Sequence, residues 1–172
     1  MNARKLVMLA LFTAVSLCLF VIEAQIPPLT PFPGIKTGLA NIVTLFILYR
    51  KDARLKFSGM DVSAVVAARV LLSAFVTGGA FVLLFSFTGG MAAVAAMLLF
   101  RRIFKGGLIP VAGVAGAVTH NAGQLATAVF VYKSVSVLLY LPILVLGGIA
   151  SGLFTGFTVK VVLNRLDKTK GG

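Results

Sequence analysis

Residues 6–25 read LVMLALFTAVSLCLFVIEAQ, an apolar run of twenty positions in which Glu23 is the one charged side chain. A helix needs about 20 residues to cross the hydrocarbon core of a bilayer. A helix of this length in water carries a charged face, and this run has none. The stretch therefore predicts a membrane-spanning helix.

The rest of the chain repeats this apolar pattern. Of its 172 residues, 59% are hydrophobic and 12% are charged, which is more apolar than a soluble domain of this size. Five further apolar runs are separated by basic, proline-rich or glycine-containing segments. They cover residues 35–49, 60–77, 80–100, 108–131 and 135–162. We predict a single all-α domain over residues 1–172, built as a bundle of six transmembrane helices.

Basic residues set the expected orientation of these helices. Of 16 Lys and Arg residues, thirteen fall near the two termini and in the second and fourth connections, Lys36 and Lys133 fall on the opposite side, and Arg69 lies within the third run. Cytoplasmic loops carry the excess of Lys and Arg, so both termini are expected in the cytoplasm. The same clustering argues against a nucleic-acid partner, which requires a solvated basic face.

A proline-rich segment precedes the second run. Residues 26–34, IPPLTPFPG, contain four prolines and cannot be helical throughout. The second run, residues 35–49, reaches only about 22 Å as a helix, which is less than the roughly 30 Å of hydrocarbon. We expect the proline-rich segment to fill the remaining depth and to roof a site at the outer face. A simple external turn is the alternative.

Few polar side chains lie inside the runs, and each charged one costs about 2.5–3.5 kcal/mol at mid-helix. Arg69 lies near the middle of the third run and Asn41 in the outer half of the second. In the fifth run Gln124 comes four positions after His120 and three after Asn121, so these residues are expected to form one polar patch.

These positions predict a small-molecule pocket open to the outside. Lys36 and Arg69 favour an anionic group of the ligand, the amides and His120 orient its polar edges, and Phe32 closes the roof. The predicted substrate-binding residues are Phe32, Lys36, Asn41, Arg69, His120, Asn121 and Gln124. The alternative is structural: Arg69 pairs with Glu23, and the amides join neighbouring helices.

Residues for covalent or metal chemistry are scarce. The four acidic residues do not form a close pair, and one His and one Cys make a zinc site unfavourable. The sequence also lacks a glycine-rich loop with a Lys that cradles nucleotide phosphates. We therefore expect no catalytic residue, no metal and no cofactor in this chain, and we expect that it is not an enzyme.

Small residues recur at four-residue spacing on two of the runs. Gly148, Gly152 and Gly156 repeat in the sixth, and Ala10 and Ala14 in the first. This spacing lets a neighbouring helix approach closely, so packing inside the bundle is the ordinary explanation for both patterns.

Three motifs carry a resemblance to a known family: FPGIKTGLANIV (residues 32–43), RVLL (residues 69–72) and HNAGQ (residues 120–124). They resemble the bacterial membrane family labelled heptaprenyl diphosphate synthase component I, also called the Gx transporter family, over nearly the full chain. That family in turn resembles the substrate-binding, or S, components of energy-coupling factor (ECF) transporters. Those components are six-helix proteins that capture vitamins or their precursors at the outer face.

The resemblance implies a substrate-binding subunit of an ATP-driven uptake transporter in the bacterial cytoplasmic membrane. Its substrate would be a small anionic molecule, such as a vitamin or a quinone or isoprenoid precursor. Its partners would be two ATPase subunits, which bind the ATP, and a transmembrane coupling subunit that meets Ala10 and Ala14.

The synthase label itself matches no motif in the chain. Prenyl diphosphate synthases carry Asp-Asp-x-x-Asp sequences that hold magnesium and diphosphate, and this sequence has none. The alternative function is a non-catalytic membrane subunit or anchor for an enzyme of prenyl diphosphate or quinone synthesis.

Overall fold

The computed structural model describes residues 3–25, 38–50, 55–77, 79–105 and 107–170, and the secondary structure in them is helical. The elements are α1 (Ala3–Ala24), α2 (Asn41–Tyr49), α3 (Gly59–Thr77), α4 (Ala80–Ile103), α5 (Ile109–Tyr132), the short 3-10 helix η1 (Val135–Tyr140) and α6 (Leu141–Lys170). The predicted all-α class is confirmed.

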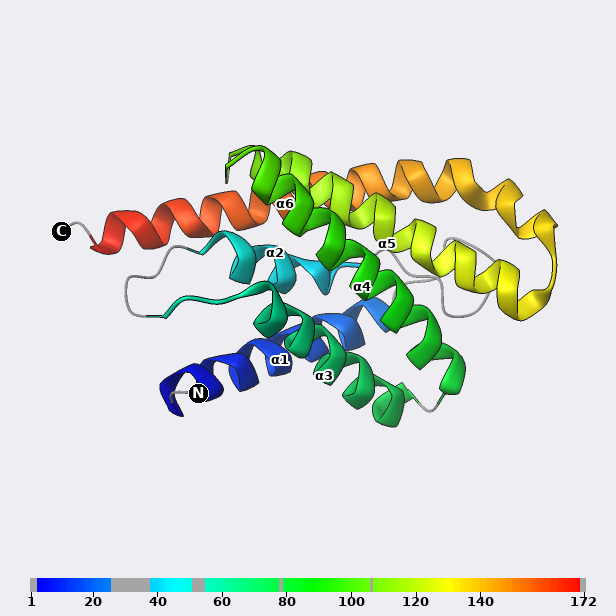
Figure 1. The fold of residues 1–172 in the computed structure, drawn as a ribbon, viewed down its shortest axis with the longest axis horizontal. Helices are drawn as coiled ribbons and strands as arrows, with labels where there is room; N and C mark the ends of the chain where they lie inside the picture. The colour runs from blue at the N-terminus through cyan, green and yellow to red at the C-terminus, as the bar shows by residue number, and fades with distance from the viewer. Residues whose placement is uncertain (1–2, 26–37, 51–54, 78, 106, 171–172) are drawn as a thin grey trace.

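The other α-helices are arranged around α2, the shortest α-helix. Helix α4 packs on α5 and α5 on α6, while α3 packs on α4 and carries α1 on its other side (Figure 1). Helix α2 contacts each of the other five helices and therefore lies at the centre of the bundle. Among the described residues, α1 makes no helix contact beyond α2 and α3.

The apolar interior follows this arrangement. The main cluster joins α2, α3 and α4 and has fully buried side chains at Leu45, Leu48, Val62, Val66, Val70 and Met97. A second cluster lies between α4, α5 and the start of α6, with Phe85, Leu125 and Leu144.

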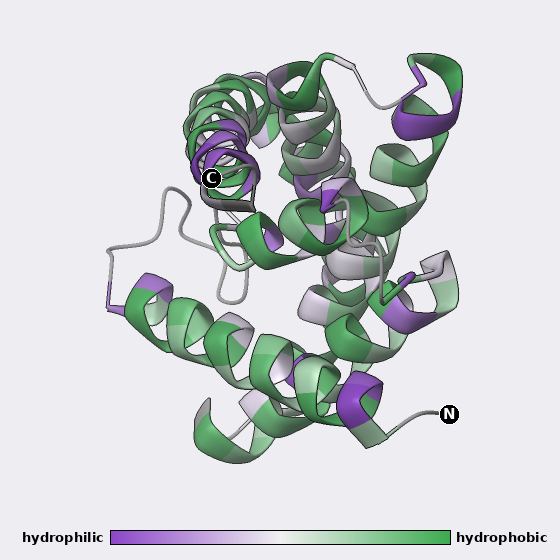
Figure 2. Cartoon of the chain, turned by 90° about the vertical axis from the view of Figure 1, so that its left-hand side faces the viewer, coloured by the Kyte–Doolittle hydropathy of each residue, from purple (hydrophilic) through white to green (hydrophobic). Residues whose placement is uncertain are grey.

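The outer surface of the bundle is also apolar, as expected for a membrane protein. Phe75 is 88% exposed and Phe130 is 80% exposed, and contiguous exposure of such side chains is unfavourable in water. Hydrophobic colour covers most of the helix flanks, and hydrophilic colour gathers at the start of α1 and the end of α6 (Figure 2).

Four helices in the described residues are long and apolar enough to cross a membrane, namely α1, α3, α4 and the stretch from η1 through α6. Helix α2 has only 9 residues. Helix α5 is continuous over 24 residues, but its apolar sequence is interrupted by the polar residues Thr119, His120, Asn121 and Gln124. The chain is therefore a membrane protein, with four of the six predicted spans recognisable by length and composition.

Two predicted helix boundaries differ from the structure. Residues 35–37 lie outside the described part, and α2 begins only at Asn41, after a turn in which Asn41 N donates to Gly38 O at 2.9 Å. Gly38 has φ +82°, a left-handed conformation that glycine adopts readily. The second helix is therefore shorter than predicted. The proline-rich segment at residues 26–34 lies outside the described residues.

The sixth helix starts later and ends later than predicted. Residues 135–140 form η1, and α6 begins at Leu141, because the ring of Pro142 is accommodated only in the first turn of an α-helix. Beyond Val162 the helix continues to Lys170, since no glycine or proline follows before Gly171.

The glycine repeat on α6 packs directly on α5, which confirms the predicted close approach. A Cβ atom placed on Gly152 would lie 2.7 Å from Val114 N, and one on Gly156 would lie 2.5 Å from Pro110 Cα. Both neighbours are backbone atoms, which cannot move aside without displacing the whole helix. Helices α5 and α6 therefore depend on glycine at these positions.

We predict that Gly152→Leu destabilises the bundle by about 3 kcal/mol, because the new side chain forces α5 and α6 apart. Thermal unfolding in detergent, followed by circular dichroism, measures the effect. The control is Ala150→Leu, since Ala150 is exposed on the same helix. Equal unfolding temperatures for the two variants would show that the close packing of α5 on α6 is not important for stability.

Candidate functional site

Buried polar side chains from four helices line one small cavity. It is bounded by Phe20 and Glu23 of α1, Gly38, Arg69 of α3, Ser86 of α4, and His120 and Gln124 of α5. Arg69 is 2% exposed, Glu23 4%, His120 3% and Gln124 0%. About 10 Å³ is open to the centre of a water-sized sphere, which is room for about one water molecule.

Arg69 is the cation of this cluster. Its guanidinium interacts electrostatically with Glu23 and lies 5.8 Å from the centre of the Phe20 ring. Glu23 in turn accepts a hydrogen bond from the backbone N–H of Gly38. Glu23 therefore supplies a negative charge near Arg69, which the structural alternative for this pair requires.

Two nitrogens of the Arg69 guanidinium, Nε and Nη2, have no hydrogen-bond partner among the described residues. In arginine these two N–H groups lie on one edge and match the two oxygens of a carboxylate or a phosphate. A buried donor without a partner costs about 1–3 kcal/mol, and more when the group is charged. The contact with Glu23 thus leaves one edge of the guanidinium with capacity for an anion.

His120 lies on the side of the cavity formed by α5. Its side chain is hydrogen-bonded to the backbone of Gly89 on α4, while no described residue pairs with its Nδ1. Gly89 makes this contact possible, because a Cβ there would lie 2.9 Å from Gln124 Cγ and 3.0 Å from His120 Cε1. Gly90 borders Arg69 in the same way, since its Cβ would lie 3.3 Å from Nη2.

Asn41 is the first residue of α2 and lies beside this cluster. It is 2% exposed, and neither atom of its amide has a hydrogen-bond partner in the part of the chain that the structure describes. A Cβ on Gly38 would meet both Asn41 Nδ2, at 2.9 Å, and His120 Cδ2, at 3.1 Å. Asn41 and His120 are therefore close neighbours across the turn at Gly38.

Asn121 differs from the prediction that it shares one patch with His120 and Gln124. It is buried, but its Nδ2 donates to the carbonyl oxygen of Leu144 on α6 at 2.7 Å. One residue corresponds to about 100° of rotation around a helix, so Asn121 points to α6 while its neighbour His120 faces the cavity. Asn121 joins two helices and does not line the cavity.

The remaining predicted residues fall into two groups. Phe32 and Lys36 lie outside the described residues. The ordinary explanation for the spacing of Ala10 and Ala14 was packing inside the bundle. Both residues are exposed on α1, so within the described chain they do not pack there.

Sequence reasoning missed Ser86 and the packing role of Gly89. Ser86 is 3% exposed and borders the cavity, but a single serine in an apolar run is common and carries no signal by itself. The adjacent glycines Gly89 and Gly90 are visible in the sequence. Paired glycines in a membrane helix let side chains from two other helices approach closely, and this signal could have identified them. No three His, Cys, Asp or Glu side chains come together in the described residues.

Comparison with known proteins gives one match. A family model described as heptaprenyl diphosphate synthase component I matches residues 12–162. No curated protein and no solved structure matches the chain.

We predict that Arg69 and Glu23 are strongly coupled in stability. Removing one charge leaves the other buried and uncompensated, so Arg69→Met and Glu23→Gln should each cost about 3 kcal/mol, while the double variant should cost much less than the sum. Unfolding by a denaturing detergent in mixed micelles measures the three values.

The partly exposed pair of Lys5 Nζ and Asp61 Oδ2, 2.7 Å apart, provides the control. The matched variants Lys5→Met and Asp61→Asn should couple by less than about 1 kcal/mol. Additive losses at Arg69 and Glu23 would contradict the contact between them.

Proposed function

The chain belongs to the heptaprenyl diphosphate synthase component I family, and we propose that it is a substrate-binding subunit of an ATP-driven uptake transporter of the ECF type. In this proposal it captures a small anionic molecule at the outer face of the bacterial cytoplasmic membrane. The chain itself carries no catalytic step and no cofactor; partner ATPase subunits use the ATP.

The observation that supports this proposal best is the buried guanidinium of Arg69. An arginine at mid-membrane is expensive and marks a functional site unless it is fully paired. Here Glu23 interacts with it, yet Nε and Nη2 have no described partner. An anionic ligand on that edge would complete the hydrogen bonds of the guanidinium, and Asn41 and His120 would supply further polar contacts.

The size of the cavity indicates how a ligand would enter. Room for about one water molecule is too small for a vitamin-sized ligand, so a wall must move before such a molecule binds. Helix α1 supplies one wall through Phe20 and Glu23, and its described helix contacts are with α2 and α3 only. We therefore assign the opening to a displacement of α1 relative to α4 and α5.

The proposal requires six crossings with both termini in the cytoplasm. Helix α5 is long enough to cross, and its low apolar content comes from the residues that build the site. Helix α2 is buried at the centre of the bundle, so its shortness is compatible with a position inside the membrane where protein surrounds it. In this orientation Glu23 and Asn41 come at the outer ends of α1 and α2.

A partner for the outer surface of α1 follows from the same proposal. Ala10 and Ala14 are exposed on one face of this helix, and small residues at this spacing let another membrane helix approach closely. The coupling subunit of the transporter would bind there.

The second candidate is a non-catalytic membrane subunit for prenyl diphosphate or quinone synthesis. It is favoured by the description of the matched family, which names a component of heptaprenyl diphosphate synthase. Purification of the tagged chain from its own membrane separates the two candidates. A coupling subunit and ATPases in the eluate support uptake, while a soluble prenyl synthase that loses activity when this chain is deleted supports the alternative.

We predict that Arg69→Lys weakens the stabilisation of the protein by its anionic ligand. A lysine keeps the charge but loses the planar pair of donors, and a hydrogen bond to a charged group contributes about 1.5–3 kcal/mol. Affinity should therefore fall about tenfold to hundredfold. A thermal-shift screen with small carboxylates and phosphates identifies the ligand and measures the change.

Asn121→Leu is the matched control for this experiment. It removes a buried amide on α5 that bonds to Leu144, so it should lower the unfolding temperature and leave the ligand-induced shift unchanged. A ligand shift that survives Arg69→Lys but disappears in Asn121→Leu would place the binding site against α6 instead.

A further inference from the structure

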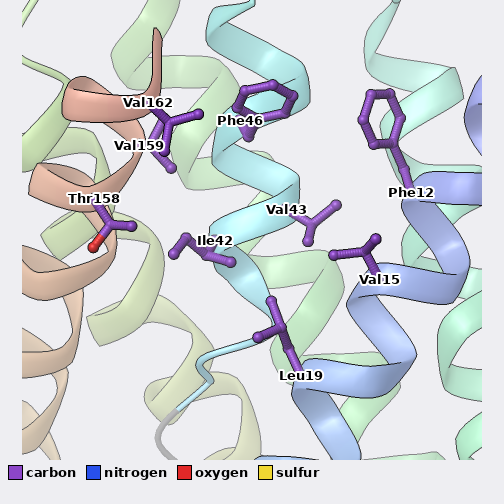
Figure 3. Close-up of a pocket in the computed structure, with 9 residues that line it drawn as sticks. All are labelled: Phe12, Val15, Leu19, Ile42, Val43, Phe46, Thr158, Val159 and Val162. Carbon is purple, nitrogen blue, oxygen red and sulfur yellow. The ribbon is translucent and has the colours of Figure 1, made fainter. Parts of the chain in front are cut away.

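A second hollow lies away from the polar cavity, on the surface of the bundle. It is a groove between α1 and α6 with α2 as its floor, and it has a volume of about 230 Å³ (Figure 3). Helices α1 and α6 make no contact with each other in the described residues, so the groove separates them. Val15 and Leu19 form one wall, Val159 and Val162 the other, and Ile42 extends from α2 toward α6.

The lining of this groove is apolar. Among the described residues that line it, Thr158 has the one polar side chain, and its hydroxyl donates to the carbonyl oxygen of Phe154 in its own helix at 2.7 Å. The groove therefore offers dispersion contacts and no hydrogen bonds to an occupant, which suits a hydrocarbon.

The inner end of the groove carries a positive charge. Phe46 and Phe12 lie at this end (Figure 3), and the guanidinium carbon of Arg50 lies 5.9 Å from the centre of the Phe46 ring. On the other wall, α6 continues from Val162 to the exposed Arg165. An amphiphile with its chain in the groove would thus place its headgroup among basic residues.

The dimensions favour a chain over a helix. The wall on α1 runs from Phe12 to Leu19, which is about 10 Å along the helix axis. The whole empty space between the walls is about 560 Å³, which over that length gives a cross-section of about 50 Å². A helix with its side chains is about 10–12 Å across and would need roughly 80 Å² or more.

We infer that this groove binds one acyl chain of an anionic phospholipid from the cytoplasmic leaflet, with the lipid headgroup against Arg50. The inference is independent of the substrate site, because the two hollows have no lining residue in common. A lipid in this position would fill the gap between α1 and α6 and would stabilise the spacing of these two helices.

Fluorescence quenching tests this inference, because the chain contains no Trp. Phe46→Trp places a single reporter at the inner end of the groove. The protein is reconstituted in phosphatidylcholine vesicles that contain, at the same low mole fraction, phosphatidylglycerol or phosphatidylcholine with brominated acyl chains. One basic residue near the surface should favour the anionic lipid about fivefold at this site.

Two controls make the result specific. Phe157→Trp places the reporter on the exposed face of α6, where the two brominated lipids should quench alike. In Phe46→Trp with Arg50→Gln, the preference for phosphatidylglycerol should be lost. A third arm, Val162→Phe at a lining residue that is 41% exposed, fills the groove and should lower quenching at position 46 without changing quenching at position 157.

Three results of the bromolipid experiment would overturn the inference. They are equal quenching by both brominated lipids at position 46, the same preference at positions 46 and 157, and a preference that survives Arg50→Gln. Relief of the quenching by an equal mole fraction of a long-chain prenyl diphosphate would also overturn it, because the groove would then prefer that amphiphile to the bilayer lipid.

Discussion

The burial of Arg69 beside Glu23 is the constraint on which the rest of the structure depends. A guanidinium that is 2% exposed inside an apolar bundle has lost its water, and an attractive carboxylate repays only part of that cost. The backbone around the pair accommodates both charged groups. The Gly38 turn donates a backbone N–H to Glu23, and the missing side chain of Gly90 leaves room beside the guanidinium.

Close packing elsewhere supports this polar cluster. The α6 glycines let α5 and α6 touch through their backbones, and the bond from Asn121 to Leu144 holds the same two helices together. Helix α5 is thereby fixed on one side, and its other side presents His120 and Gln124 to the cavity. Lipid-facing helix surfaces need only be apolar, so the polar residues of the bundle concentrate where they serve structure or binding.

Much of this architecture is predictable because the chain alternates long apolar runs with short polar breaks. The end of α3 and the start of α4 could be predicted from the two glycines between them. The buried polar residues could be picked out of the sequence because so few polar residues lie in the apolar runs. The neighbours of a helix cannot be read from one sequence, however. His120 and Asn121 are adjacent, and only the positions of α1, α3 and α6 decide that one faces the cavity and the other faces α6. The start of α2 depends likewise on the left-handed conformation of Gly38, which its sequence permits but does not require.

Native mass spectrometry of the protein, released from its own membrane without added ligand, tests the central claim most directly. We predict that the wild-type chain carries one small anionic molecule and that Arg69→Met carries none, while both retain their bound lipids. A wild-type chain that carries lipid alone, or a small molecule retained equally by Arg69→Met, would show that the guanidinium is a structural partner of Glu23 and does not hold a substrate.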